Sequence, residues 1–91
     1  MINLKNKKVL ITGSSRGIGA EIAKKLADLG AEVVINYANS KDSAEKVKES
    51  IEAQGGVAHV IQADISNFEE AKSLIKNSYK KMNGLNVLIN N

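Results

Sequence analysis

The sequence contains no cysteine and no proline, and it has one histidine among its 91 residues. Without cysteine there can be neither a disulfide framework nor a thiolate metal site, and one histidine cannot build a zinc site. The absence of proline is compatible with uninterrupted helices. We therefore expect neither a disulfide-stabilised fold nor a metal centre.

Long apolar runs are missing as well. No segment approaches the roughly 20 apolar residues that a membrane-spanning helix needs, and no apolar run follows the N-terminal lysines as in a signal peptide. Hydrophobic residues make up 43% of the chain and charged residues 25%, which is typical of a globular protein. We expect one domain with a packed core, no membrane contact and a cytoplasmic location.

The formal net charge of +3 raises the question of a nucleic-acid partner. Lys5, Lys7 and Lys8 account for all of this excess, because the rest of the chain carries ten basic and ten acidic residues. Those charges are interleaved along segments with helical spacing, which is typical of a solvated surface. The charge pattern therefore argues against nucleic-acid binding.

Four short apolar runs predict β-strands. They comprise residues 9–11, residues 33–35, residues 60–61 with Val57 just before them, and residues 87–89. Each run is continuous rather than alternating, as expected when both faces of a parallel sheet are covered by helices.

Three stretches between these runs have the apolar spacing of helices. The first repeats at Ile18, Ile22, Leu26 and Leu29 and ends at Gly30. The second is weaker, with Ala44, Val47 and Ile51 before Gly55 and Gly56. The third has the stripe Phe68, Ala71, Ile75, Tyr79 and Met82, with a capping box at Ser66 and Glu69 and an end at Gly84. The stripes are expected to form the core.

Strands and helices therefore alternate from one end of the chain to the other, which indicates an α/β fold. Right-handed crossovers predict a partial Rossmann fold with a four-stranded parallel sheet in the order 3-2-1-4 and three helices. The fourth strand lies beside the first and leaves an open edge.

The most informative segment follows the first strand, where residues 12–19 read Thr-Gly-Ser-Ser-Arg-Gly-Ile-Gly and lead into the first helix. Glycines let a backbone turn tightly against a pyrophosphate, and a helix N-terminus offers unpaired amides to it. The segment lacks the Gly-Lys-Ser/Thr ending of an ATP-binding P-loop. The alternative is a turn that only allows close packing, but its place between strand and helix favours a phosphate site.

These residues resemble the fingerprint of the short-chain dehydrogenases/reductases, Thr-Gly-x3-Gly-x-Gly. The resemblance continues at Asp64 and Ile65, and residues 88–91 look like the start of the family's Asn-Asn-Ala-Gly segment. Within the family, the chain looks most like the 3-oxoacyl-acyl-carrier-protein reductases. The resemblance implies a dinucleotide site formed by Gly13, Ser15, Arg16, Gly17, Ile18, Gly19, Tyr37, Ser40, Asp64, Ile65, Asn90 and Asn91.

The end of the second strand bears on the choice of cofactor. Folds that prefer NAD place a carboxylate there for the ribose hydroxyl, roughly 20 residues past the glycine loop, whereas this chain has Asn36 and Tyr37. The guanidinium of Arg16 could bind a 2′-phosphate, so NADPH is favoured over NADH. Ser40 and Lys41 could add a hydroxyl and a charge, or simply begin the second helix.

In the family that this chain resembles, hydride transfer depends on a Tyr, a Lys four residues later and a Ser, all beyond the Asn-Asn-Ala-Gly segment. No residue here occupies a matching position. Tyr37 and Lys41 have the spacing of the pair, but they lie across a strand end and a turn, so nothing forces them together. We expect Tyr79 to be a core residue, His59 to make a local hydrogen bond in the third strand, and Asp64 to have no catalytic role.

Two hypotheses follow. In the first, the chain is the N-terminal portion of an NADPH-dependent carbonyl reductase, truncated within the Asn-Asn-Ala-Gly segment and inactive alone; the parent would reduce 3-oxoacyl thioesters in fatty acid biosynthesis. In the second, the chain is a non-catalytic binding or assembly module. The expected partners are a dinucleotide and either the missing C-terminal half or a second copy of the chain at the open sheet edge.

Overall fold

A computed structural model describes residues 2–91. Strands and helices alternate strictly along the chain, in the order β1 (Lys8–Ile11), α1 (Gly17–Asp28), β2 (Glu32–Tyr37), α2 (Lys41–Ala53), β3 (Val57–Gln62), α3 (Phe68–Met82) and β4 (Val87–Ile89). In the part of the chain that the structure describes, no helix is long and apolar enough to cross a membrane.

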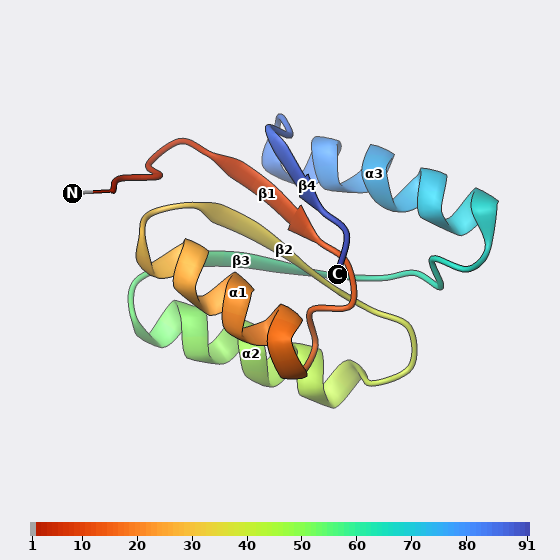
Figure 1. The fold of residues 1–91 in the computed structure, drawn as a ribbon, viewed down its shortest axis with the longest axis horizontal. Coiled ribbons are helices and arrows are strands. Elements are labelled where there is room, and N and C mark those ends of the chain that lie inside the picture. The colour runs from red at the N-terminus through yellow and green to blue at the C-terminus, as the bar shows by residue number, and fades with distance from the viewer. Residues whose placement is uncertain (1) are drawn as a thin grey trace.

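The four strands form one parallel sheet in the order β3-β2-β1-β4, as predicted. Val9 lies at the centre, paired with Val33 on one side and Val87 on the other. Helices α1 and α2 cover one face and α3 covers the other (Figure 1). This arrangement is required when all crossovers share one hand, because the chain moves in one direction from β1 to β3 and returns to reach β4.

The sheet separates two apolar layers of different size. The larger layer, toward α1 and α2, includes Val9, Ile11, Val33, Ile35 and Val47. The smaller layer, toward α3, is built by Leu10, Val34, Ala63, Leu74 and Met82. Neighbouring residues of β1 and β2 enter opposite layers, so the continuous apolar runs are explained by a sheet covered on both faces.

The predicted buried stripe of α1 is wrong in part. Ile18 is 75% exposed, and the residues that face the sheet are small, namely Gly19, Ala20, Ala23 and Ala27. Ile22 and Leu26 flank this face and are partly buried. Small side chains allow the helix axis to approach the sheet, so the larger residues pack beside the contact rather than in it. Gly30, at φ 109°, ends the helix segment as predicted.

The predicted core stripe of α3 is also wrong in part. Phe68 is 76% exposed and Tyr79 is 58% exposed, so Tyr79 is not a core residue. The helix instead buries Leu74, Ser78 and Met82, which lie four residues apart on the adjacent face. The predicted stripe and the stripe that contains Ser78 both have helical spacing. The stripe with Ser78 is the one that is buried, and its Leu74 and Met82 pack with Leu10 and Val34.

The start of α3 lies one residue later than the proposed capping box. Asn67 is the N-cap, and its Oδ1 accepts a hydrogen bond from the backbone N–H of Glu70 at 3.0 Å. The Ser66 hydroxyl makes no capping bond and donates instead to Asp64 Oδ1 at 2.6 Å. Ser66 thus belongs to the turn before the helix rather than to its cap.

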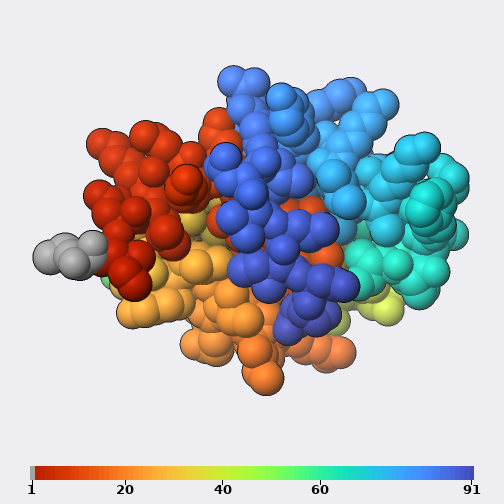
Figure 2. Space-filling model, turned by 45° about the horizontal axis from the view of Figure 1, so that its top comes forward, coloured from red at the N-terminus to blue at the C-terminus, as the bar shows by residue number. Residues whose placement is uncertain are grey.

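Strand β4 forms one edge of the sheet. It pairs only with β1 within the described residues, and Figure 2 shows the C-terminal segment, in blue, lying on the surface of the molecule. Leu88 is 49% exposed although its pairing partner Leu10 is fully buried. Ile75 and Tyr79 of α3 are exposed as well, at 44% and 58%.

Candidate functional site

The candidate site lies at the carboxyl end of the sheet. The glycine loop follows β1, Tyr37 ends β2, Asp64 follows β3, and Asn90 follows β4. Because the strands are parallel, all of these positions lie at the same edge. The chain order reverses between β1 and β4, and ligands of open α/β sheets bind at such a switch point.

Two glycines of the loop have backbone conformations that other residues rarely adopt. Gly13 has φ 60° and Gly17 has φ 61°. The first turns the chain out of β1, and the second begins α1. At Gly17 an added Cβ would meet no atom within 4 Å, so the backbone angle rather than space explains glycine there.

Gly19 has a different reason to be glycine. A Cβ at this position would lie 2.6 Å from the carbonyl oxygen of Gly13 and 2.6 Å from Nδ2 of Asn91. The helix can therefore pass close to the loop and to the end of β4 only if residue 19 has no side chain.

The N-terminus of α1 has no internal cap. Arg16 is the N-cap residue, its side chain makes no capping hydrogen bond, and the first turn contains no acidic residue. Among residues 2–91, no acceptor is found for the backbone amides of residues 15–19, and the next amide, that of Ala20, bonds to Arg16 O. Unpaired amides and the positive end of the helix dipole favour an anion at this position.

Asn36 supports the glycine loop from within the protein. This side chain is 2% exposed, and its Oδ1 accepts the Gly13 N–H at 3.0 Å. Its Nδ2 points the other way, to the carbonyl oxygens of Ile61 at 3.2 Å and Ala63 at 3.3 Å. Asn36 lies at the end of β2 where a ribose was expected, but its polar atoms are engaged within the protein.

Buried Ser14 completes this support. Its hydroxyl donates to Ile11 O at 2.7 Å and accepts the Asn36 N–H at 2.9 Å, while its own N–H donates to Asn36 O at 3.0 Å. The sequence analysis assigned no role to Ser14. A polar residue directly after the apolar run 33–35 was the available signal for Asn36, but nothing in the sequence indicated its partners.

The end of β4 is joined to the same loop through Thr12. The Thr12 hydroxyl accepts the Asn91 N–H at 3.0 Å and lies 3.2 Å from Asn90 Oδ1. Asn91 Nδ2 also donates to Gly13 O at 3.1 Å. Asn90 and Asn91, both predicted site residues, are thus brought to the base of the glycine loop and bond to it.

The segment after β2 carries the other predicted contacts. Tyr37 is half-buried at the strand end, and Ser40 is the N-cap residue of α2, without a side-chain capping bond. Lys41 begins that helix. Gln62 Nε2 donates to Ala38 O at 2.9 Å and so ties this segment to β3.

Asp64 and Ile65 are exposed beyond the end of β3. The Ser66 hydroxyl, and then the Ser66 N–H, hold the pKa of the Asp64 carboxyl below its ordinary value. One carboxylate oxygen, Oδ1, accepts both bonds. Asp64 is therefore an anion at neutral pH and is tied into the turn that leads to α3.

His59 lies on β3 as predicted, and its hydrogen-bond partner is not local. Its Nε2 lies 2.6 Å from Glu32 Oε2 on the neighbouring strand. Glu32 begins β2, so this pair is at the amino end of the sheet, away from the glycine loop.

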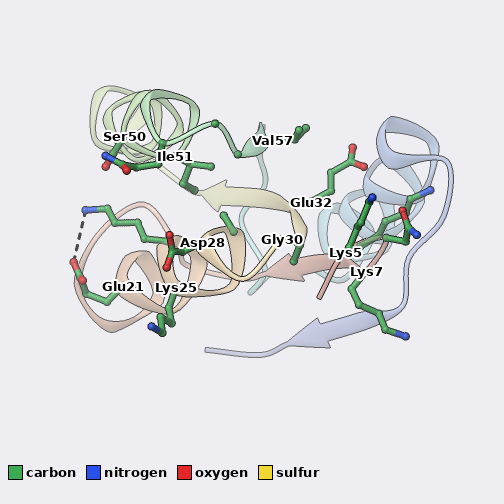
Figure 3. Close-up of a pocket in the computed structure, with 18 residues that line it drawn as sticks. Lys5, Lys7, Glu21, Lys25, Asp28, Gly30, Glu32, Ser50, Ile51 and Val57 are labelled. Carbon is green, nitrogen blue, oxygen red and sulfur yellow. Dashed lines mark ion pairs between the residues drawn. The ribbon is translucent and has the colours of Figure 1, made fainter. Parts of the chain in front are cut away.

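A hollow of about 730 Å³ lies at that amino end (Figure 3). Its lining mixes basic residues, such as Lys5 and Lys25, with acidic ones, such as Asp28 and Glu32. Glu21 forms an ion pair there with Lys24 at 3.6 Å. None of the predicted site residues lines it. The mixed charge and the position opposite the switch point distinguish this hollow from the candidate site.

The sequence was compared with family models and with known proteins to identify its family. Residues 7–91 match the family model described as short chain dehydrogenase. The chain belongs to this family. It is 47% identical over 91 residues to an uncharacterized oxidoreductase of Methylorubrum extorquens, covering all of this chain and 37% of that protein. It is 46% identical over 86 residues to the 3-oxoacyl-[acyl-carrier-protein] reductase FabG of Staphylococcus epidermidis, covering 94% of this chain and 35% of that one.

Solved structures that resemble this chain support the same family assignment. A dehydrogenase/reductase from Sinorhizobium meliloti superposes with TM-score 0.97 at 41% identity, over 99% of this chain and 36% of that one. A short chain dehydrogenase from Burkholderia cenocepacia, solved in complex with NADP, gives TM-score 0.91 at 42% identity, over 94% and 35%. The chain thus spans little more than a third of the length of these relatives.

Proposed function

We propose that the chain binds a nicotinamide dinucleotide, with the diphosphate at the N-terminus of α1. The observation that carries this proposal is the uncapped helix start, whose amides at residues 15–19 have no acceptor among residues 2–91. The glycine turns at Gly13 and Gly17 expose backbone rather than side chains at this point. The complex of the Burkholderia cenocepacia relative with NADP supports the choice of ligand.

The remaining contacts are proposed from the positions of the side chains. Gly13, Ser15, Arg16, Gly17, Ile18 and Gly19 would surround the diphosphate. Tyr37 and Ser40 would flank the adenosine ribose, and Asp64 and Ile65 would lie at the adenine. Asn90 and Asn91 would complete the site through their bonds to Thr12 and Gly13.

We propose NADPH as the preferred form over NADH. Arg16 is exposed beside the uncapped helix start, and β2 ends at Tyr37, so no carboxylate stands at the strand end to repel a 2′-phosphate. A guanidinium can bind phosphate through two parallel hydrogen bonds.

Calorimetric titration of the Arg16→Ala variant tests this preference. We expect about tenfold weaker NADPH binding, equivalent to roughly 1.4 kcal/mol, and little change for NADH. Lys72→Ala serves as the matched cation control, since Lys72 is exposed on α3 and is not among the proposed contacts. Equal losses for the two nucleotides in Arg16→Ala would contradict the assignment.

For the whole protein we propose an NADPH-dependent carbonyl reductase of which residues 1–91 are the N-terminal portion. The similarity to FabG supports reduction of 3-oxoacyl-acyl-carrier-protein to the 3-hydroxyacyl product as the parent reaction; fatty acid biosynthesis and a cytoplasmic location are proposed with it. We expect the 91 residues alone to be inactive, because no residue matches the family's catalytic Ser, Tyr and Lys. Oxidation of NADPH by the pure chain with an acetoacetyl thioester would refute this.

A second candidate function is that of an assembly module. Exposed apolar side chains favour association, and Leu88 on the edge strand and Ile75 and Tyr79 on α3 are exposed among residues 2–91. Sedimentation velocity distinguishes the module from the N-terminal portion of a reductase. One defined complex of the isolated chain would support a module, whereas heterogeneous aggregation would support a portion of a larger domain.

A further inference from the structure

We propose that Asn36 is a positioning residue that sets the direction in which the glycine loop presents its amides to the nucleotide. The inference rests on the nucleotide binding proposed above and concerns a residue that would not itself touch the ligand. Asn36 is 2% exposed, and it lies at the last but one position of β2.

Asn36 fixes Gly13 and Ser14 within the loop. Its Oδ1 accepts the Gly13 N–H at 3.0 Å, and its main-chain oxygen accepts the Ser14 N–H at 3.0 Å. Its own N–H donates to Ser14 Oγ at 2.9 Å. Three hydrogen bonds thus hold residues 13 and 14 against β2, and the chain can turn outward only after them.

The other half of the side chain fixes the orientation of the amide. Nδ2 lies 3.2 Å from Ile61 O and 3.3 Å from Ala63 O at the end of β3. With its donors directed at these carbonyls, the amide must present its oxygen to Gly13. An aspartate would place a carboxylate against both carbonyls, and an alanine would leave the Gly13 N–H without its acceptor.

This arrangement divides the amides of the loop into two sets. Those of Gly13 and Ser14 are used within the protein, whereas those of residues 15–19 have no protein acceptor among residues 2–91. The diphosphate should therefore meet amides only from Ser15 onward. Because NADPH and NADH share the diphosphate, loss of the Asn36 side chain should weaken both nucleotides alike.

Hydrogen exchange of the wild-type chain, followed by ¹⁵N NMR, tests the division without any substitution. Without nucleotide, we expect the Gly13 and Ser14 amides to exchange at least tenfold more slowly than those of Ser15 and Arg16. Adding NADPH should slow exchange at residues 15–19 and leave Gly13 unchanged. Gly13 exchange as fast as that of Ser15, slowed only by nucleotide, would overturn the proposal.

Asn36→Ala tests the consequence for binding. We expect about tenfold weaker binding of both NADPH and NADH, the effect of roughly one hydrogen bond of 1.4 kcal/mol, together with faster Gly13 exchange. Val34→Ala is the matched control, because Val34 is fully buried, on the same strand and face, two residues from Asn36. It should lower stability without changing either affinity at temperatures where both variants are folded.

The outcomes separate the two proposals. Equal affinities of Asn36→Ala and Val34→Ala overturn the positioning role while leaving nucleotide binding intact, and so does a loss confined to NADPH. Failure of the wild-type chain to bind either nucleotide overturns the proposed function and this inference with it. If Asn36→Ala does not fold, the exchange pattern of the wild-type chain decides the question.

Discussion

The first turns of α1 and α3 differ in how their unpaired backbone amides are satisfied. Helix α3 satisfies its own N-terminus, because Asn67 caps the Glu70 amide at 3.0 Å and its first turn carries two acidic residues. Helix α1 has no side-chain cap and no acid in its first turn. Both helix dipoles have their positive end at the N-terminus, and this difference is the reason we propose an anion from outside the protein at the start of α1.

The surroundings of the two helix starts differ too. The α3 start lies at the surface and is held by its own neighbours, as when Glu70 Oε1 accepts the Asp64 N–H at 2.9 Å. The loop that leads into α1 is held at Gly13 by two residues distant in sequence, Asn36 of β2 and Asn91 beyond the end of β4. Because the amides of residues 15–19 make no hydrogen bonds within residues 2–91, the position of this segment depends on bonds made by the neighbouring residues.

The largest effect is expected from Gly19→Ala at the α1 start. The new Cβ would lie 2.6 Å from the Gly13 carbonyl oxygen, so loop and helix must separate. We expect the free energy of unfolding to fall by about 2–3 kcal/mol in urea titration. Gly17→Ala is the control, with a positive φ but no close contact, and should cost about 1 kcal/mol. The account fails if Gly17→Ala costs the same or more.

Removal of the α3 cap should affect stability alone. Asn67→Ala leaves the Glu70 amide without its acceptor, and we expect a loss of about 1 kcal/mol in thermal or urea unfolding. Nucleotide affinity should not change. Arg16→Ala should give the reverse pattern, with unchanged stability and weaker NADPH binding. An affinity loss in Asn67→Ala would mean that the two helix starts are not independent.

An acid introduced at each helix start sharpens the comparison. Ile18 and Phe68 are equally exposed, at 75% and 76%, in the first turns of α1 and α3. Ile18→Glu should raise stability by about 0.3–1 kcal/mol, because α1 has no acid to complement its dipole, and should weaken NADPH through repulsion. Phe68→Glu should change neither quantity appreciably. The opposite ranking in unfolding and titration experiments would contradict the account.

The smallest effect concerns Asp64. Because the bonds from Ser66 favour the carboxylate, the pKa of Asp64 in the folded chain lies below its ordinary value of 3.8. The associated stability is present above that pH and is lost as the pH falls through the folded pKa. An NMR titration should show a lowered pKa that returns toward its ordinary value in Ser66→Ala. No difference between wild type and variant would refute the stated cause.

The order of elements and the sheet were predictable because they depend on local signals. The apolar runs at 9–11, 33–35 and 87–89 each became a strand, and handedness rules gave the order β3-β2-β1-β4. The helix faces were not predictable in the same way. Ile18 and Tyr79 fit an apolar spacing, yet the buried residues include Ala23 and Ser78 on adjacent stripes. Only packing against the sheet distinguishes the two stripes of each helix.

The candidate site was predictable to a similar extent. The glycine loop and the strand ends were recognisable from sequence, because each follows an apolar run. The support by Asn36 was not, since its partners Gly13 and Ala63 are distant in sequence and become neighbours only through the strand order. The same reason hid Glu32 as the partner of His59.

The most direct test of the contrast between the two helix starts is a titration of the ¹⁵N-labelled chain with NADPH. The account predicts that amide resonances of residues 15–19 shift in a saturable manner, while those of residues 67–70 at the start of α3 stay in place. Shifts at the start of α3 with none at residues 15–19, or no saturable shift at either, would contradict the claim that α1 leaves its N-terminus open for a diphosphate.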